Sequence, residues 1–276
     1  MPTSDVGGAM LPLILDAEEL ADSSAADGIL VISLSKAEQY AEGHIPGAVH
    51  LDFASLNASR PPVGGLLPND QALSDLFSNL GLSDGTHVVA YDDEGGGRAS
   101  RLLWTLDVLG HSGFSLLNGG WEAWLRARLP VETAAVSPEK SAYRARAGEA
   151  GLAQKAYILS RLGAVDFALV DTRTPEEFSG ENRRAERGGH IPGAVNFNWI
   201  NAMDAERQRR IRPRDELINE LAALGVTADK EVVAYCQTHH RSSHTYIVLK
   251  SLGFDRVRGY PGAWSEWGND PATPVE

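Results

Sequence analysis

The sequence has little cysteine, no long apolar run and no excess of positive charge. One cysteine among 276 residues excludes a disulfide within the chain, which suits a reducing compartment. No stretch reaches the roughly 18 apolar residues of a membrane span. Lysine and arginine together number 25 against 37 aspartates and glutamates, a formal net charge of −12. This balance argues against nucleic acid and anionic membranes as partners, and we expect a cytoplasmic protein.

The apolar content is sufficient for ordinary hydrophobic cores. Hydrophobic residues make up 43% of the chain, six of them tryptophans, and the length fits two domains. At the N-terminus, Met1–Asp16 lack a basic segment, and Pro12 interrupts their apolar stretch. We therefore expect neither a signal peptide nor a membrane anchor there.

The chain repeats itself in four blocks that recur in the same order at a nearly constant shift. The pairs are Leu30–Tyr40 with Leu169–Phe178, His44–Val49 with His190–Val195, Val88–Tyr91 with Val232–Tyr235, and Gly119–Trp124 with Gly262–Trp267. Such self-similarity predicts two homologous domains. We place them at residues 10–130 and 156–276, and interpret residues 131–155 as a linker that crosses the surface.

Within each repeat, short β-branched runs alternate with stretches of helical spacing. The predicted strands are Leu30–Ile32, His87–Tyr91, Leu169–Val170 and Glu231–Tyr235. The predicted helices, each followed by a glycine, are Gln71–Leu80, Arg214–Leu224 and Ser242–Leu252. This alternation predicts an α/β fold in which each domain has a mainly parallel central sheet flanked by helices. Ligands of such sheets lie at the carboxyl ends of the strands.

Cys236 lies between a predicted strand and a predicted helix. The N–H groups and the dipole of a helix N-terminus point at such a position, and Arg241 adds a permanent positive charge. These surroundings lower the pKa of a cysteine, so we interpret Cys236 as a nucleophile. The alternative is a buried structural cysteine, which is common for a lone free thiol. The polar residues that directly follow Cys236 argue against that alternative.

Taken together, these blocks resemble the rhodanese family of sulfurtransferases in its tandem two-domain form. The match rests on Leu169–Arg173, the turn Gly189–Ala194, the loop Cys236–Arg241 and the block Gly262–Trp267, and covers nearly the whole chain. The resemblance implies a persulfide on a cysteine of the second domain and an inactive first domain. The loop is similar to that of bacterial thiosulfate sulfurtransferases and differs from the Cys-Gly-Ser-Gly-Val-Thr loop of 3-mercaptopyruvate enzymes.

The residues of the first repeat also indicate that it is inactive. Asp92 occupies the position that matches Cys236, and an aspartate is no sulfur nucleophile. We interpret its loop, Asp92–Gly97, as an inert segment at the domain interface. A cation site and a phosphate cradle are the alternatives, but the cradle lacks the Lys-Ser/Thr of a P-loop. Two serines replace an acidic and a basic residue: Ser33 and Ser35 stand where the second repeat has Asp171 and Arg173.

We expect the Cys236 thiolate to take the outer sulfur of thiosulfate, release sulfite, and pass the sulfur from a persulfide to cyanide or a thiol. N–H groups of the loop are expected to stabilise the terminal sulfur. The expected substrate-binding residues are Gln237, Thr238, His239, His240 and Arg241. We expect no cofactor, metal or general base, and the final acceptor can be a protein. For Arg241 we also consider an inward pairing with a buried carboxylate.

Other chemistries remain as rivals. They are a 3-mercaptopyruvate donor, a non-catalytic sulfur or selenium carrier, and a cysteine phosphatase or reductase. Four residues separate Cys236 from Arg241, whereas cysteine phosphatases use five, and the tighter loop suits a single sulfur atom. Zinc at Cys236 is disfavoured because the adjacent histidines His239 and His240 point apart in most backbones.

The chain departs from the family pattern at Glu177, where the resemblance implies a substrate-binding arginine. One interpretation is that Arg183, Arg184 or Arg187 supplies the positive charge of the missing arginine. The other is that these three arginines form a charged stretch in contact with water. The arginines between residues 207 and 214 also have two interpretations. They form a solvated surface, or they attract the anionic sulfur donor to the site.

Several conspicuous residues are expected to maintain the fold. They are His44 and His190 in the two repeated turns, the tryptophans Trp121, Trp124, Trp264 and Trp267, and Asp171 with Arg173 as an ion pair. A substrate role for Arg173 is the alternative to that pair.

Overall fold

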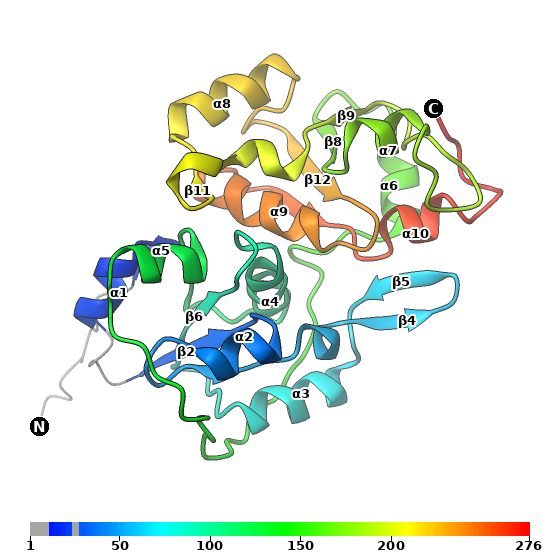
Figure 1. Cartoon of the computed structure of the whole chain (residues 1–276). Helices are drawn as coiled ribbons and strands as arrows, with labels where there is room; N and C mark the ends of the chain where they lie inside the picture. Colours follow the sequence, from blue (N-terminus) through cyan, green and yellow to red (C-terminus); the bar gives the residue numbers. More distant parts are fainter. Residues whose placement is uncertain (1–10, 24–27) are drawn as a thin grey trace, which may run out of the picture.

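In the computed structural model, which describes residues 11–23 and 28–276, two parallel sheets organise the chain, one for each repeat (Figure 1). The first sheet has the strand order β1-β7-β6-β2-β3. Its strands are β1 (Ile14–Leu15), β2 (Ile29–Ser33), β3 (Val49–His50), β6 (His87–Tyr91) and β7 (Phe114–Leu117). The second sheet has the order β13-β12-β8-β9. Its strands are β8 (Phe167–Asp171), β9 (Ala194–Asn196), β12 (Glu231–Tyr235) and β13 (Val257–Gly259). Because β13-β12-β8-β9 matches β7-β6-β2-β3, the sequence repeat is also a structural repeat, and the α/β prediction is confirmed.

Helices flank both sheets. The first domain contains α1 (Ala17–Ser23), α2 (Ala37–Glu42), α3 (Asp70–Asn79), α4 (Gly97–Val108) and α5 (Gly120–Arg126). The second contains α6 (Lys155–Arg161), α7 (Pro175–Ser179), α8 (Arg214–Ala223), α9 (Arg241–Ser251) and α10 (Ala263–Trp267). Two antiparallel hairpins are formed by β4 (Ala58–Arg60) with β5 (Val63–Leu66), and β10 (Met203–Asp204) with β11 (Arg210–Ile211). Short 3-10 turns lie at Phe53–Leu56, Trp199–Ala202 and Ala205–Arg207.

The predicted elements agree closely with these boundaries. Strands β6 and β12 have the predicted residues. Helix α8 differs from prediction by one residue at its C-terminal end, and α3 and α9 differ by one residue at both ends. Each of these helices stops just before its predicted last leucine because that residue is the C-cap, followed by a glycine in the left-handed conformation.

Helices α4 and α9 join the two domains by packing against each other at the centre of the molecule (Figure 1). One hydrophobic core cluster contains residues of both helices, among them Trp104 of α4 and Ile247 of α9. At the rim of this contact, Asp107 of α4 accepts hydrogen bonds from Tyr246 and Lys250 of α9, each at 2.5 Å. Since α4 follows β6 and α9 follows β12, the loops that precede these helices come together at the interface.

A hairpin from each domain reaches across to the other. The β4–β5 hairpin lies beneath α10 in Figure 1, where Gly64 N–H donates to Ser265 Oγ at 3.0 Å. In the opposite direction, Arg210 of β11 pairs with Asp16 at 3.3 Å and is only 15% exposed. The expectation of a solvated surface is therefore wrong for Arg210, because its hairpin packs on the first domain.

The segment between the domains, residues 130–154, runs along the first domain before it reaches the second. Ser141 N–H donates to the Ser78 carbonyl at 2.9 Å, and Ala153 N–H donates to the Gly259 carbonyl at 2.8 Å. The start of the predicted first domain at residue 10 and the expectation for residues 1–10 lie outside the described residues. In the part of the chain that the structure describes, no helix combines the length and apolarity of a membrane-spanning segment.

The predicted fold-maintaining residues are confirmed in that role. His44 stacks on Tyr40 at 3.9 Å between ring centroids, and His190 stacks on Phe178 at 3.6 Å. The Nδ1 atom of each histidine lies within hydrogen-bond distance of the carbonyl of the same aromatic residue. The four repeated tryptophans, Trp121, Trp124, Trp264 and Trp267, are buried.

Candidate active site

Cys236 directly follows β12, and α9 begins at Arg241. The side chain is only 1% exposed, so the polar residues that follow Cys236 do not keep the thiol at the surface. The β4–β5 hairpin of the other domain covers the loop, because a Cβ atom on Gly65 would lie 2.1 Å from the carbonyl oxygen of Thr238. Thr238 itself remains partly exposed. The active-site loop is therefore built from one domain and covered by the other.

The buried thiol is nevertheless in surroundings that favour its anion. Burial raises the pKa of Cys236, but the charge of Arg241 and hydrogen bonds from the Ser242 hydroxyl and the N–H groups of Ser242 and Thr238 lower it by more. The net result is a pKa below the ordinary value of a cysteine. The surroundings are thus polar at the sulfur although water is nearly excluded, and this combination suits a nucleophilic thiolate rather than a structural cysteine.

Arg241 lies between this thiol and a buried carboxylate. Its Nη1 and Nη2 atoms donate to Glu177 Oε2 and Oε1 at 2.5 and 2.9 Å, and Glu177 is 2% exposed. The inward pairing considered for Arg241 is confirmed. Although burial alone raises the pKa of Glu177, Arg241 lowers it below the usual range. Glu177 therefore orients the guanidinium that acts on Cys236, which explains an acid at a position where the resemblance implies an arginine.

His239 is fully buried and faces the first domain instead of solvent. Its ring centroid lies 4.4 Å from that of Trp104, and its backbone has a φ of 55°. Its Nδ1 atom lies 2.7 Å from Ser242 Oγ. Because the Ser242 hydroxyl donates to the Cys236 sulfur, it can only accept from His239, so His239 carries the proton on Nδ1. Burial lowers the pKa of His239 well below its ordinary value, so the ring is neutral.

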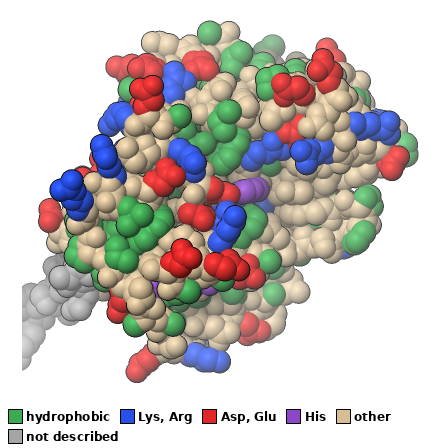
Figure 2. Space-filling model, in the orientation of Figure 1, with side chains coloured by type: hydrophobic (Ala, Val, Ile, Leu, Met, Phe, Trp, Pro, Cys, Tyr) green, Lys and Arg blue, Asp and Glu red, His purple; other side chains and the backbone are tan. Residues whose placement is uncertain are grey.

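The other expected substrate-binding residues are near the loop surface. His240 Nε2 lies 2.5 Å from Glu94 Oε1 of the first domain, and Figure 2 shows charged side chains of both signs, with a histidine among them, where the domains meet. Gln237 Nε2 donates to the Arg184 carbonyl at 3.1 Å. The structure thus brings Cys236, Thr238 and Arg241 together and joins His240 to the first domain. His239 is buried and cannot contact a sulfur donor such as thiosulfate.

The three arginines between residues 183 and 187 have different environments. Arg184 lies 3.4 Å from Glu177 Oε1 and its side chain is 57% exposed. Arg187 donates to the carbonyls of Trp267 and Thr273, at 2.7 and 2.6 Å, and so fixes the C-terminal segment. Arg183 pairs only loosely with exposed Glu186, at 3.8 Å. Among them, Arg184 is the one located at the active-site loop.

The matching loop of the first domain has an internal anion. Asp92 is buried, and its carboxylate accepts hydrogen bonds from the N–H groups of Glu94, Gly96 and Ala99 at 3.0, 2.8 and 2.9 Å. Its loop contacts His240, so the interface interpretation is confirmed. The interpretation of this loop as a phosphate cradle is wrong, because the Asp92 carboxylate already accepts the N–H hydrogen bonds that a phosphate would need. Within residues 11–23 and 28–276, no group of three metal-binding side chains supports a cation site there.

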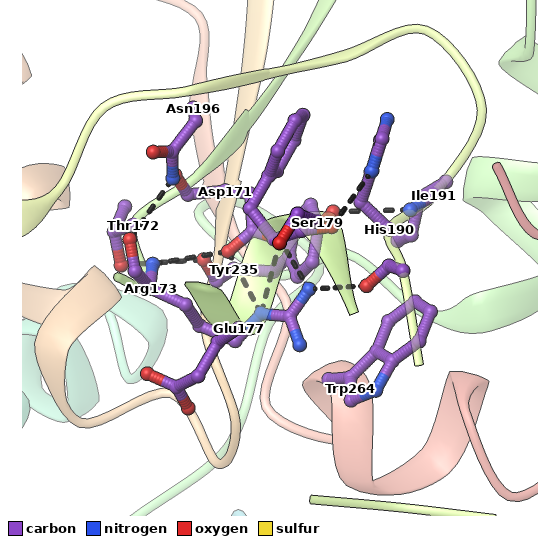
Figure 3. Close-up of polar contacts among 12 residues, drawn as sticks. Asp171, Thr172, Arg173, Glu177, Ser179, His190, Ile191, Asn196, Tyr235 and Trp264 are labelled. Carbon is purple, nitrogen blue, oxygen red and sulfur yellow. Dashed lines mark hydrogen bonds and ion pairs between the residues drawn. The ribbon is translucent and has the colours of Figure 1, made fainter. Parts of the chain in front are cut away.

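Asp171 and Arg173 form the predicted ion pair near the end of β8. Arg173 Nη2 donates to Asp171 Oδ2 at 2.6 Å and to the Gly189 carbonyl at 2.8 Å. Figure 3 shows the Arg173 guanidinium next to Trp264, and its centre lies 4.5 Å from that ring. In the same view Glu177 points away from this cluster. Because Nε and Nη2 donate to Asp171 and to the Gly189 carbonyl and the side chain is 1% exposed, Arg173 is structural.

Two residues of the site were not identified from sequence. Ser242 donates to the sulfur, and its place in the first turn of a helix after Cys236 is a local signal that was available. Arg101 of α4 donates to the carbonyl of His239 at 3.3 Å. No local signal identifies Arg101, because it acts across the domain interface.

Comparison with known proteins gives a consistent result. The rhodanese-like domain family matches the chain twice, over residues 16–127 and 154–270. A protein of Azotobacter vinelandii named thiosulfate sulfurtransferase is 45% identical over 268 residues, covering 97% of this chain and 98% of the relative. A Pseudomonas aeruginosa protein with the same name is 44% identical and covers 96% of this chain and 97% of its own length.

More distant similarities extend this picture. The sulfur carrier protein TtuD of Thermus thermophilus is 33% identical over 249 residues, 86% of either chain. Among solved structures, YnjE has a TM-score of 0.85 at 24% identity and covers 95% of this chain and 68% of its own. EanB has a TM-score of 0.84 at 22% identity, covering 96% of this chain and 69% of its own. At such identities these two structures support the fold alone.

Proposed function

Because this chain belongs to the rhodanese-like domain family, we propose that it is an enzyme, a thiosulfate sulfurtransferase that carries sulfur on Cys236. The observation that carries the proposal is the placement of Cys236, a buried thiol that lies against Arg241 and hydrogen-bond donors of its own loop, surroundings that lower its pKa. A structural cysteine needs neither a paired guanidinium nor a hydroxyl donor. The relatives named thiosulfate sulfurtransferase support thiosulfate as the donor.

In the first half-reaction, the Cys236 thiolate attacks the outer sulfur of thiosulfate. A sulfur–sulfur bond forms to Cys236 while the sulfur–sulfur bond of thiosulfate breaks, and sulfite leaves with the electron pair. No proton moves, so no general base is required. The exposed guanidinium of Arg184 and the partly exposed Arg241 mark the side from which an anionic donor approaches.

In the second half-reaction, a thiophile removes the terminal sulfur of the persulfide. Cyanide attacks that sulfur, thiocyanate leaves, and the Cys236 thiolate is regenerated. Until then, the negative charge on the persulfide is stabilised by the N–H and hydroxyl donors that lower the pKa of Cys236. Thr238 and Gln237, both partly exposed, line the loop around the carried sulfur.

A protein acceptor is the second candidate for this step. The 33% identity to the sulfur carrier protein TtuD supports it. In that case the protein accepts sulfur from thiosulfate but transfers it slowly to cyanide and to small thiols. A 3-mercaptopyruvate donor is the remaining rival, and the ratio of kcat/KM for the two donors decides between them.

The same proposal gives the two domains different roles. The first, residues 10–130, is catalytically inactive, since Asp92 cannot carry sulfur; the second, residues 156–276, performs the chemistry, and residues 131–155 connect them. A thiol that must remain free between turnovers suits the cytoplasm, where thiols are kept reduced.

Intact-protein mass spectrometry tests this function directly. Incubation of the purified protein with thiosulfate should add one sulfur atom, and cyanide should then remove it with formation of thiocyanate. The Cys236→Ser variant serves as the control and should gain no sulfur. A wild-type protein that gains no sulfur atom would overturn the proposal, and hydrolysis of an aryl phosphate dependent on Cys236 would replace it by phosphatase chemistry.

A further inference from the structure

Arg101 of α4 is a buried cation without an ordinary counter-ion. Its side chain is 0% exposed, and within residues 11–23 and 28–276 no carboxylate forms an ion pair with it. Its Nε atom also has no hydrogen-bond partner among these residues. Removing a guanidinium from water without a paired anion is costly. A residue with this cost requires a compensating interaction.

The hydrogen bonds of Arg101 all lead to backbone carbonyls that meet at the active-site loop. Nη2 donates to the carbonyls of Gly65 and Leu56 at 2.8 and 3.2 Å, and these belong to the segment that covers the loop. Nη1 donates to the His239 carbonyl at 3.3 Å, inside the loop. The guanidinium also lies 4.7 Å from the centre of the Trp104 ring, which contacts the ring of His239.

His239 connects Arg101 to the sulfur of Cys236 through a chain of hydrogen bonds. Its left-handed backbone is held at the carbonyl by Arg101 and by the Ser243 hydroxyl. Its ring donates from Nδ1 to Ser242 Oγ, and the Ser242 hydroxyl donates to Cys236. Moving the His239 carbonyl would therefore misalign the hydroxyl that stabilises the anion.

The positive charge of Arg101 is a second way in which this residue acts on Cys236. Burial lowers the pKa of Arg101 by more than the nearby Cys236 anion raises it, to a net value of about 9, so the guanidinium is still protonated at neutral pH. This attraction is reciprocal, because a cation stabilised by an anion stabilises that anion by the same free energy. In nearly dry surroundings such an interaction is screened far less than at the surface.

We propose that Arg101 is a positioning residue that the inactive first domain supplies to the catalytic loop. It fixes the His239 carbonyl, and its buried positive charge compensates the negative charge of the Cys236 thiolate and of the persulfide. The proposal rests on the proposed function insofar as the anion that forms during turnover is a persulfide. It gives the first domain a part in catalysis although that domain carries no nucleophile.

Several other charged or titratable groups face the sulfur or its neighbours and set the background of any pH measurement. They are Arg241 with Glu177 and Arg184 on the second domain, His239 in the loop, and the His240–Glu94 pair at the interface. All of these groups are present in every variant, so a shift between variants reports on Arg101 and on the His239 carbonyl that it holds.

Three variants separate charge from hydrogen bonding. Arg101→Met removes both and keeps an apolar side chain, a replacement that buried charges often tolerate. Arg101→Lys keeps the charge but loses the planar guanidinium that donates to four backbone carbonyls. Arg126→Met, at the exposed end of α5, is the control, because it changes the net charge equally and, among the described residues, no hydrogen bond or ion pair joins Arg126 to the active-site loop.

The primary measurement is the rate of Cys236 alkylation by iodoacetamide as a function of pH, together with kcat and KM for thiosulfate. For Arg101→Met we expect the alkylation midpoint to rise by about one pH unit and kcat to fall about tenfold, with little change in KM. For Arg101→Lys we expect a midpoint near that of the wild type and a kcat about threefold lower. Arg126→Met should match the wild type in both.

The outcomes distinguish this proposal from the proposed function. An Arg101→Met protein with the wild-type midpoint and kcat, even if its melting temperature is lower, would show that Arg101 only attaches the hairpin to α4. If Arg101→Met does not fold, Arg101→Lys decides, and a wild-type kcat in that variant overturns the proposal. If the wild type takes up no sulfur, the proposed function fails, while the alkylation midpoints still report whether Arg101 acts on Cys236.

Discussion

The loops after β6 and after β12 are two versions of the same anion cradle. In each, backbone N–H groups at the start of a central helix surround the first residue after the strand. In the first domain this residue is Asp92, whose carboxylate permanently occupies the cradle. In the second it is Cys236, whose sulfur acquires its charge by ionisation and can extend by one atom. The geometry is shared, and the chemistry depends on whether the anion is fixed or can carry a further atom.

The charges that act on the two cradles differ. Arg241 lowers the pKa of Cys236, whereas the matching position in the first domain is Gly97, and the charge of Glu94 raises the pKa of Asp92. Burial and Glu94 raise the pKa of Asp92 despite its three N–H donors, while the pKa of Cys236 is lowered despite burial. Three N–H donors therefore do not lower the pKa of Asp92 against burial and Glu94, whereas the pKa of Cys236, which also interacts with a guanidinium, is lowered.

The largest expected effect comes from replacing the two matching residues by alanine, one at a time. Cys236→Ala should lower thiocyanate formation from thiosulfate and cyanide by at least about a thousandfold with the fold intact, because the nucleophile is gone. Asp92→Ala should leave turnover within a few-fold. It should lower the free energy of unfolding by about 1–3 kcal/mol, because three N–H groups, two of them buried, lose their acceptor. Steady-state kinetics and urea unfolding measure both, and a hundredfold loss of turnover in Asp92→Ala would refute the contrast.

An intermediate effect is expected at the guanidinium that distinguishes the cradles. A thiolate with a lowered pKa persists on the acidic side, so activity should decline only below that pKa. Arg241→Met should move the acidic limb of kcat/KM upward by about one pH unit and reduce kcat/KM at neutral pH about ten- to a hundredfold. Glu177→Gln leaves the charge of Arg241 uncompensated and should move the limb downward.

The measurement is kcat/KM from about pH 5 to 9, with the fold of each variant checked by circular dichroism. Shifts of the same sign in Arg241→Met and Glu177→Gln would contradict the assignment of Arg241 as the group that lowers the pKa of Cys236.

The smallest effect is expected at the exposed rim of the active loop. Arg184→Ala should raise KM for thiosulfate about two- to fivefold with kcat nearly unchanged, since this exposed cation attracts the donor but is screened by water. The increase should shrink as salt is added. Arg183→Ala, one residue away and equally exposed, is the matched control and should match the wild type. An equal rise of KM in both variants would indicate general steering by the surface charge.

The strand–loop–helix order around Cys236 could be predicted from sequence because it depends on local pattern. Strand β12 contains the apolar run Val232–Tyr235, and Gly253 follows the C-cap of α9, so the strand before the loop and the helix after it are both encoded in neighbouring residues. The duplication supplied the rest of the fold, since each block had to form the same element twice.

The burial of Cys236 and the direction of His239 could not be predicted in this way. The cover over the loop comes from a hairpin far away in sequence, at Gly65, and the left-handed backbone of His239 reverses where its ring points. The pairing of Arg241 could be stated only as one of two possibilities. The role of Arg101 could not be predicted from the sequence, because it depends on the packing of α4 against α9.

The shared core between α4 and α9 has a consequence for the evolution and handling of this protein. The apolar face of α9 is covered by the other half of the molecule, so the sulfur-carrying half expressed alone would present that face to water and tend to aggregate. If the two halves arose by gene duplication, the first domain would be retained after losing its thiol because it covers the catalytic domain. Selection should then remove core mutations in the first domain nearly as efficiently as mutations next to Cys236.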